Sequence, residues 1–212
     1  MYRANFSEES ALWRAGFMRV AGVDEAGTGA WAGPVVAGAA ILPGKVRLPL
    51  LQDSKALSPA QREQVFACFT DAGILFVAGI VSVTEINQMN IRSAAFLAMR
   101  RAVAALSIIP SHLLVDAFHI PNIVIPQRAI IRGDRLVKSI AAASIVAKVT
   151  RDRMMQELHD AYPLYGFAKH KGYGTAVHQR ALAEHGPSDA HRLRFAPVVA
   201  AGRTWVEKET IF

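Results

Sequence analysis

The segment MRVAGVDEAGTGAWAGPVVAGAAIL, residues 18–42, is the part of the sequence that says most about the fold. Two short apolar runs, residues 18–23 and 35–42, have the length of β-strands. The segment between them carries four turn residues, Gly27, Gly29, Gly33 and Pro34. They indicate a hairpin-like reversal of the chain, so we predict two adjoining strands. The first run is followed directly by two adjacent acids, Asp24 and Glu25.

Beyond this stretch, helical and strand patterns alternate along the chain. Ser58-Pro59-Ala60-Gln61 is typical of a helix start, because serine can cap a helix and proline suits its first position. We predict helices over 58–70, 84–106, 137–159 and 175–184, and strands over 74–83, 113–116 and 123–131. Residues 1–16 form a leader, and the small residues of 139–144 would let their helix lie close to a sheet. The pattern predicts an α/β fold with a mixed central sheet flanked by helices.

The composition excludes several classes of protein. Of the 212 residues, 52% are apolar and 19% are charged, which excludes a mainly disordered chain. The single cysteine, Cys68, excludes an intrachain disulfide framework. The sequence has no apolar run of 18 residues and no apolar core of a signal peptide near its start. We therefore expect a cytoplasmic protein without a membrane span.

The net charge suggests a partner. Lys and Arg together number 24 and Asp and Glu 17, which gives a formal charge of +7. Basic proteins often bind phosphate polymers or anionic membrane surfaces, although such a charge can also serve solubility alone.

Four acids stand where strands end or turns begin: Asp24, Glu25, Asp116 and Asp134. In open α/β sheets, sites form at strand ends, so these side chains can converge. Clustered carboxylates favour hard cations such as Mg²⁺ or Mn²⁺, and two such ions can promote phosphodiester hydrolysis. The alternative is structural, because acids at these places also cap helices or lie in solvated turns. Asp134 in particular could cap the helix that follows it.

The glycine-rich segment is not a dinucleotide-binding loop. Its spacing is GxGxxxG, and an apolar β-branched run follows it where a dinucleotide fold needs a helix. The glycines instead favour a close approach of a nucleic-acid backbone or sugar to exposed main-chain amides.

Several motifs together resemble the ribonuclease HII family. In chain order they are the VDEAGTG and AGPV segments of 23–35, Asp53-Ser54-Lys55-Ala56-Leu57-Ser58, Leu114-Val115-Asp116, Gly133-Asp134 with SIAAASIVAKVTRD at 139–152, HKGYGT at 170–175, and His191-Arg192 with Phe195-Ala196-Pro197. The matches keep this order and span roughly residues 17–200.

The resemblance implies an RNase H-like fold with a C-terminal helical part. It divides the chain into the leader 1–16, a catalytic domain 17–160 and a substrate-binding part with a tail, 161–212. It implies an endonuclease that hydrolyses the RNA strand of RNA–DNA hybrids and nicks on the 5′ side of ribonucleotides embedded in duplex DNA, leaving 3′-hydroxyl and 5′-phosphate ends. Two Mg²⁺ or Mn²⁺ ions would be held by Asp24, Glu25, Asp116 and Asp134. We expect the enzyme to be a monomer that serves ribonucleotide excision repair.

The resemblance also implies substrate contacts. The aromatic ring of Tyr173 would pack on the ribose, and its alternative is a half-buried core tyrosine. Candidate phosphate contacts are Lys55, Ser144 and Lys148, of which the last two share a helix face that could equally be a solvated one. His170 is expected to be an exposed polar residue rather than a metal ligand.

One position departs from the family pattern. The family usually has Arg or Lys between the two glycines that are here Gly27 and Gly29, whereas this chain has Thr28. The glycine amides can still meet a ribose 2′-hydroxyl, but a cationic contact is lost. Two rival interpretations follow: a hybrid-binding protein with weak or lost turnover, and an unrelated basic α/β protein whose acids are structural. The end of the chain, 203–212, could be a partner-binding tail or a packed end.

Overall fold

A computed structural model describes residues 4–44, 46–48, 50–51 and 54–209, with side chains of the last helix only as far as Arg203. Its strands are β1 (Val20–Ala26), β2 (Val35–Ile41), β3 (Leu75–Val81), β4 (His112–Asp116) and β5 (Gln127–Ile130). Its α-helices are α1 (Ser7–Arg14), α2 (Pro59–Ala67), α3 (Val83–Gln88), α4 (Ile91–Ala104), α5 (Gly133–Leu136), α6 (Lys138–Ala161), α7 (Phe167–His170), α8 (Ala176–His185) and α9 (Ala196–Glu209). Short 3₁₀ turns cover Ser54–Ala56 and Pro163–Tyr165.

The chain divides into two compact units. Unit 1 comprises residues 1–26, 36–80 and 95–150, and unit 2 comprises 27–35, 81–94 and 151–212. Unit 1 contains most of the sheet, and unit 2 contains the glycine-rich segment and the C-terminal helices α7, α8 and α9. The predicted boundary near residue 160 stays a prediction.

The sheet is mixed, as the sequence predicts. Its strand order is β3-β2-β1-β4-β5. β1 and β2 are antiparallel, with Ala21 opposite Ile41, whereas β4 runs parallel to β1 and β5 runs parallel to β4. The antiparallel pair is the reversal expected from the glycine-rich segment, and the parallel pairs bring the C-terminal ends of β1 and β4 side by side.

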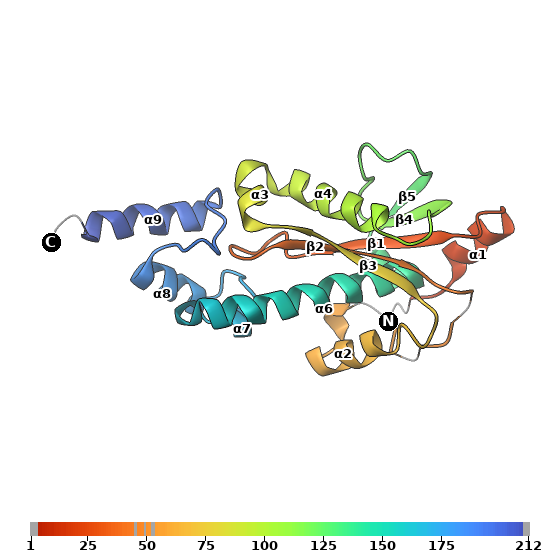
Figure 1. Cartoon of the computed structure of the whole chain (residues 1–212), viewed down its shortest axis with the longest axis horizontal. Helices are drawn as coiled ribbons and strands as arrows, with labels where there is room; N and C mark the ends of the chain where they lie inside the picture. The colour runs from red at the N-terminus through yellow and green to blue at the C-terminus, as the bar shows by residue number, and fades with distance from the viewer. Residues whose placement is uncertain (1–3, 45, 49, 52–53, 210–212) are drawn as a thin grey trace. The chain divides into compact units, whose positions relative to one another are not determined.

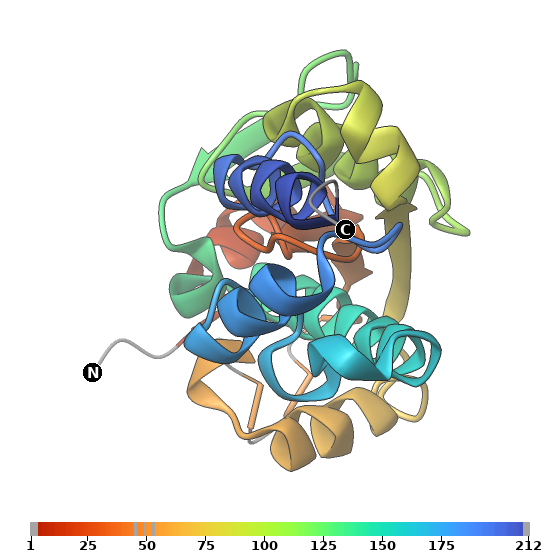
Figure 2. The ribbon, with the colours of Figure 1, turned by 90° about the vertical axis from the view of Figure 1, so that its left-hand side faces the viewer.

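Helices cover both faces of this sheet. Figure 1 shows α4 on one face and α6 with α2 on the other, and the turned view of Figure 2 shows the same layers. α6 lies very close to the sheet, because a Cβ atom at Gly22 or Gly38 would come within 2.0 Å and 2.1 Å of its backbone. The prediction that the small residues of 139–144 permit this approach is confirmed.

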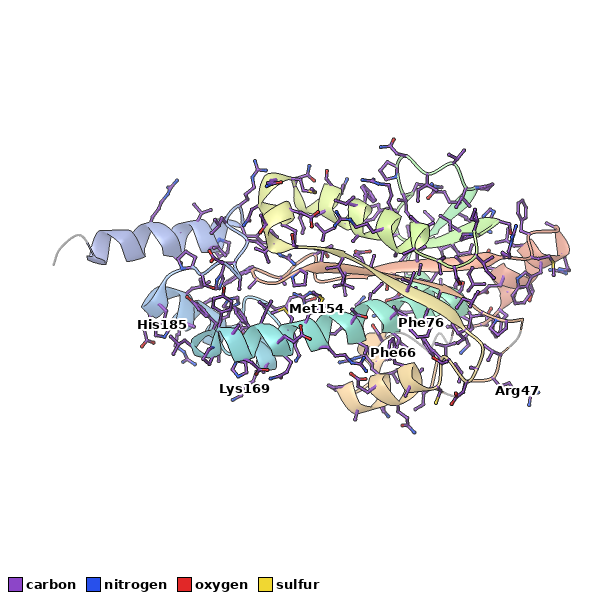
Figure 3. The ribbon with its side chains drawn as sticks, in the orientation of Figure 1. Arg47, Phe66, Phe76, Met154, Lys169 and His185 are labelled. Carbon is purple, nitrogen blue, oxygen red and sulfur yellow. The ribbon has the colours of Figure 1, made fainter. Side chains whose placement is uncertain are left out.

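An apolar core fills the space between α2, β3 and α6. Phe66 of α2 and Phe76 of β3 lie together there, with ring centroids 5.2 Å apart (Figure 3). Phe69 is fully buried beside them, 5.5 Å from Phe76. Burial of such rings is a main source of stability in a domain of this size.

The single helix predicted over 84–106 is wrong. Two helices occupy the segment, because Met89 is extended (φ −133°, ψ 176°) and the Asn90 side chain accepts a hydrogen bond from the Ser93 amide at 2.9 Å. Asn90 thus caps a new helix instead of continuing the old one. Ser82 and Glu85 form a capping box at the start of α3.

The leader packs against the sheet unit as α1. Glu9 is 1% exposed, and its Oε1 accepts a hydrogen bond from the Ser139 amide at 2.7 Å near the start of α6. A carboxylate at a helix N-terminus is favourable there. The strand predicted over 123–131 shortens to Gln127–Ile130, because Pro126 cannot donate to a sheet ladder. No helix in the described part of the chain is both long and apolar enough to cross a membrane.

Candidate active site

The four predicted acids all belong to unit 1 and come from neighbouring elements. Val23 of β1 pairs with Val115 of β4, so the next residues along these parallel strands are Asp24 and Asp116. Glu25 follows within β1, which continues through both acids to Ala26 rather than ending before them. Asp134 lies in the short helix α5, immediately before α6.

A backbone contact joins two of these places. The Gly133 amide donates to Asp116 Oδ1 at 2.7 Å, which fixes the carboxylate against the turn that carries Asp134. A Cβ atom at position 133 would meet Ile140 Cδ1 at 2.5 Å, so any other residue there requires the Ile140 side chain to shift. The hydrogen bond and the close packing together favour a glycine directly before Asp134.

Strained backbone flanks the same two acids. Ala117, directly after Asp116, has φ 57°, and Arg132, just before Gly133, has φ 58°. Residues other than glycine rarely adopt this left-handed conformation, which costs on the order of 1–3 kcal/mol and is often found at functional sites.

The charges of these acids act on one another. Burial raises the pKa of Asp24 well above its ordinary value, and the charges of Glu25 and Asp116 raise it further. Burial and the charge of Asp116 also raise the pKa of Glu25. The pKa of Asp116 is raised by burial and by the charge of Asp134. Three carboxyls therefore resist ionisation together unless a cation compensates their charge.

Lys55 is the cation that lies beside these acids. Its Nζ forms an ion pair with Asp134 Oδ2 at 3.2 Å, and its charge also lowers the pKa of Glu25 and of Asp116. The Lys55 side chain is 70% exposed, so it can reach a ligand from solvent. Asp53 of the same motif lies outside the described residues.

Ser144 lies behind Asp24. Ser144 is 4% exposed, so the solvated helix face given as its alternative is wrong. Its hydroxyl bonds to Asp24, where it favours the ionised carboxylate, and lies 2.8 Å from Ser54 Oγ. An ionised Asp24 can only accept, so in that state the Ser144 hydroxyl donates to it and the Ser54 hydroxyl donates to Ser144. Lys148, one turn further along α6, is half-buried.

The four carboxylates are chemically suited to bind a hard divalent cation. Four carboxylates offer oxygen ligands of the kind that Mg²⁺ and Mn²⁺ prefer. Among the described residues, however, no three His, Cys, Asp or Glu side chains are gathered closely enough to form a ready-made metal site.

Unit 2 brings the other predicted substrate residues together. A Cβ atom at Gly29 would lie 3.9 Å from Tyr173 Cε1, so the glycine segment and the tyrosine ring are neighbours. Gly27 has φ 94°, and a Cβ atom there would meet Arg151 Nε at 2.0 Å. Arg151 also lies under the Tyr173 ring, 5.5 Å from its centroid, and Tyr173 is 40% exposed.

Sequence reasoning missed the interior of unit 2. His170 is buried rather than exposed, and its ring stacks on His178 with centroids 4.6 Å apart. His178 and His191 are fully buried, with Nε2 atoms 3.1 Å apart, and burial lowers the pKa of each to about 4. His170 and His191 lie in motifs that the sequence shows and His178 does not, and nothing in the sequence indicated that the imidazoles meet.

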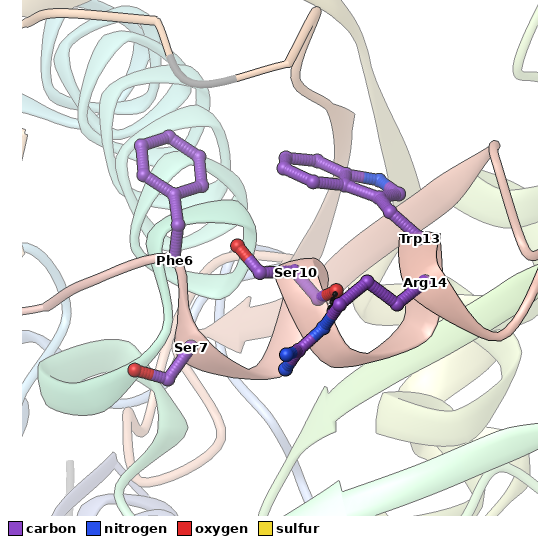
Figure 4. Close-up of a pocket in the computed structure, with 5 residues that line it drawn as sticks. All are labelled: Phe6, Ser7, Ser10, Trp13 and Arg14. Atoms are coloured by element: carbon purple, nitrogen blue, oxygen red, sulfur yellow. Dashed lines mark hydrogen bonds between the residues drawn. The ribbon is translucent and has the colours of Figure 1, made fainter.

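An open pocket on α1 lies apart from this chemistry. It is lined by Phe6, Ser7, Ser10, Trp13 and Arg14, and the Arg14 side chain donates to the Ser10 carbonyl oxygen (Figure 4). None of these lining residues is acidic or belongs to the predicted site, so the pocket plays no part in the argument for function.

Known proteins are similar to this chain in sequence and in fold. Ribonuclease HII of Geobacillus thermodenitrificans is 54% identical over 190 residues, which are 90% of this chain and 73% of the relative. Ribonuclease HII of Dehalococcoides mccartyi is 47% identical over 196 residues, 91% of this chain and 93% of the relative. The crystal structure of ribonuclease H2 from Pyrococcus horikoshii has a TM-score of 0.74 at 26% identity, covering 90% of this chain and all of that one.

The α/β sheet, its flanking helices and these neighbours define an RNase H-like protein. The sequence profile described as Ribonuclease HII matches residues 21–198, and the chain belongs to that family. It is a ribonuclease H enzyme, as its relatives are. The comparisons give no support to a hybrid-binding protein without turnover.

Proposed function

We propose that this chain is a divalent-metal-dependent endonuclease that cleaves the RNA strand of RNA–DNA hybrids and nicks on the 5′ side of ribonucleotides embedded in duplex DNA. The observation that carries the metal requirement is that desolvation and mutual repulsion raise the pKa of buried Asp24 and of half-buried Glu25 and Asp116. A site built this way is unfavourable for the folded protein unless cations bind, so its retention suggests that they do.

Asp24, Glu25, Asp116 and Asp134 would hold the metal. Two Mg²⁺ or Mn²⁺ ions would supply an activated water and stabilise the leaving 3′-oxygen. The protein's own part is to orient the ligands: the Glu25 amide donates to Asp24 Oδ1 at 2.8 Å, and the Gly133 amide donates to Asp116 Oδ1. Fixed ligands of this kind lower the cost of assembling the site during reaction.

Ser54 and Ser144 also help to orient Asp24. With Asp24 ionised, the Ser54 hydroxyl donates to Ser144 and the Ser144 hydroxyl donates to Asp24. We therefore propose Ser144 as a positioning residue for Asp24 rather than a direct phosphate contact, because its side chain is buried. Lys55 and Lys148 remain proposed phosphate contacts, and Lys55 would exchange its ion pair with Asp134 for one with the substrate.

Recognition of the ribonucleotide is proposed for unit 2. The neighbouring Tyr173 ring and Gly27-Thr28-Gly29 segment combine an exposed aromatic face with main-chain amides. An aromatic ring can stack on a sugar or base, and an amide can bond the 2′-hydroxyl that distinguishes RNA from DNA. In this proposal residues 17–160 form the catalytic domain and residues 161–212 form the substrate-binding part. The enzyme works as a cytoplasmic monomer in ribonucleotide excision repair.

The nicking claim has a direct test. A 5′-labelled DNA duplex with one internal ribonucleotide is incubated with the enzyme and Mg²⁺ or Mn²⁺, and the product is sized on a denaturing gel. We expect one product that ends with a 3′-hydroxyl immediately before the ribonucleotide, and no product from the Asp116→Asn variant. An intact duplex at enzyme excess in both metals, or cleavage on the 3′ side, would refute the proposal.

A further inference from the structure

Two arginines are fully buried in unit 2. Arg151 and Arg192 each have no exposed surface. Buried arginines ordinarily face a carboxylate, because an uncompensated charge in the interior is costly. Here the hydrogen bonds that the structure gives both guanidinium groups end on backbone carbonyl oxygens.

Most of those carbonyl oxygens belong to one loop. Arg192 Nη1 donates to the Ala30 oxygen at 2.7 Å and the Thr28 oxygen at 3.2 Å, while Nε and Nη2 donate to the oxygens of Gly33 and Pro34. Arg151 donates to the Pro34, Ala32 and Lys171 oxygens. A guanidinium fork has five donors in a fixed plane, so it can hold more carbonyls at once, and over a wider span, than the three donors of a lysine ammonium.

This arrangement is unfavourable for the arginines themselves. Burial and the neighbouring charge of Arg151 lower the pKa of Arg192 to about 9. Well-packed apolar residues often replace buried charged groups without loss of stability. Stability alone therefore does not account for two such charges behind one loop.

The contact to Thr28 has a geometric consequence. A trans peptide is planar, so the carbonyl of one residue and the amide of the next point in opposite directions. No peptide bond among the described residues is cis. When Arg192 holds the Thr28 oxygen, the Gly29 N–H is turned away from the arginine. Gly29 is exposed, and within the part of the chain that the structure describes, neither its amide nor that of Thr28 donates to a protein acceptor.

We infer that Arg192, supported by Arg151, is a positioning residue for substrate recognition: it holds the carbonyls of the 28–34 loop inward and so presents the Gly29 amide to the ribose 2′-hydroxyl. The inference rests on the proposed function, since it takes the ribonucleotide as the ligand of this loop. Arg151 connects the loop with the second recognition element, because it contacts the Tyr173 ring as well.

The test separates recognition of the 2′-hydroxyl from folding and from general binding of DNA. In an Asp116→Asn background, which leaves the substrate intact, Kd is measured with Mg²⁺ for a duplex with one ribonucleotide and for the all-DNA duplex of the same sequence. The Kd of the all-DNA duplex divided by the Kd of the ribonucleotide duplex reports recognition of the 2′-hydroxyl. Arg192→Met is compared with Arg194→Met, which removes an exposed charge two residues away.

We expect Arg192→Met to lower this ratio about fivefold, the equivalent of one hydrogen bond, with all-DNA binding changed as little as in Arg194→Met. If Arg192→Met does not fold, Arg192→Lys keeps the charge and fewer carbonyl contacts, and it should lower the ratio about twofold. An unchanged ratio in a folded Arg192 variant would overturn the inference. A parent protein without preference for the ribonucleotide would instead overturn the proposed function.

Discussion

Replacing Ser144 by alanine tests how the site holds the buried acid Asp24. The Ser144 hydroxyl bonds to Asp24 and lies 2.8 Å from Ser54 Oγ, and Ser54 is 2% exposed. The substitution leaves the Ser54 hydroxyl without an acceptor and Asp24 with only the Glu25 amide as donor. A buried polar group left unsatisfied costs about 1–3 kcal/mol, so two such groups lower the free energy of unfolding by about 2–6 kcal/mol.

The Ser54→Ala variant is the matched control. It removes the outer hydroxyl but keeps the bond between Ser144 and Asp24, so it should cost only about 1 kcal/mol. Denaturant unfolding of the metal-free proteins measures both values. We also expect Ser144→Ala to raise the metal concentration for half-maximal cleavage about tenfold, because loss of a group that orients a metal ligand weakens binding. The prediction is wrong if the free energy of unfolding of Ser144→Ala lies within about 0.5 kcal/mol of the parent value, or if Ser54→Ala loses more stability than Ser144→Ala.

Three further predictions follow. Asp116→Asn should raise the unfolding midpoint of the metal-free protein at neutral pH, because it removes a carboxylate whose pKa is raised. The same substitution should lower the rate of cleavage about 100-fold or more. A lower unfolding midpoint would contradict this prediction. Thr28→Arg should lower the KM for an embedded ribonucleotide about threefold to tenfold by adding a cationic phosphate contact, and an unchanged or higher KM would argue against it. His178 and His191, with pKa values of about 4, should stay neutral in an NMR titration down to about pH 5. Because their folded pKa lies below the unfolded value, they weaken the fold as pH falls from about 6.5 to 4, and titration near 6.5 would refute the burial argument.

The sequence was most informative where local pattern and register agree. The reversal after Asp24 and Glu25 and the small residues of 139–144 are local signals, and both have the expected structure. The acids could be selected because they follow apolar runs, and parallel pairing of β1 with β4 puts Asp24 and Asp116 at adjacent positions.

What the sequence did not reveal depends on contacts between distant residues. Arg192 holds the carbonyls of a loop about 160 residues earlier in the chain; Thr28, for example, is separated from it by 164 positions. Every residue has a backbone carbonyl, so the sequence does not show which of them Arg192 binds. His178 and His191 meet only because the helices of unit 2 pack together. The break at Met89 and Asn90 was missed for a different reason, because apolar periodicity continues across a residue that also caps the next helix.

Metal-dependent cleavage of an RNA–DNA hybrid tests the central claim most directly. Enzyme stripped with EDTA is assayed on a labelled hybrid before and after addition of Mg²⁺ or Mn²⁺, beside Asp116→Asn. The four repelling carboxylates predict no cleavage in EDTA, recovery with either ion for the parent, and no recovery for the variant. Undiminished cleavage in EDTA, or equal recovery by Asp116→Asn, would contradict the account.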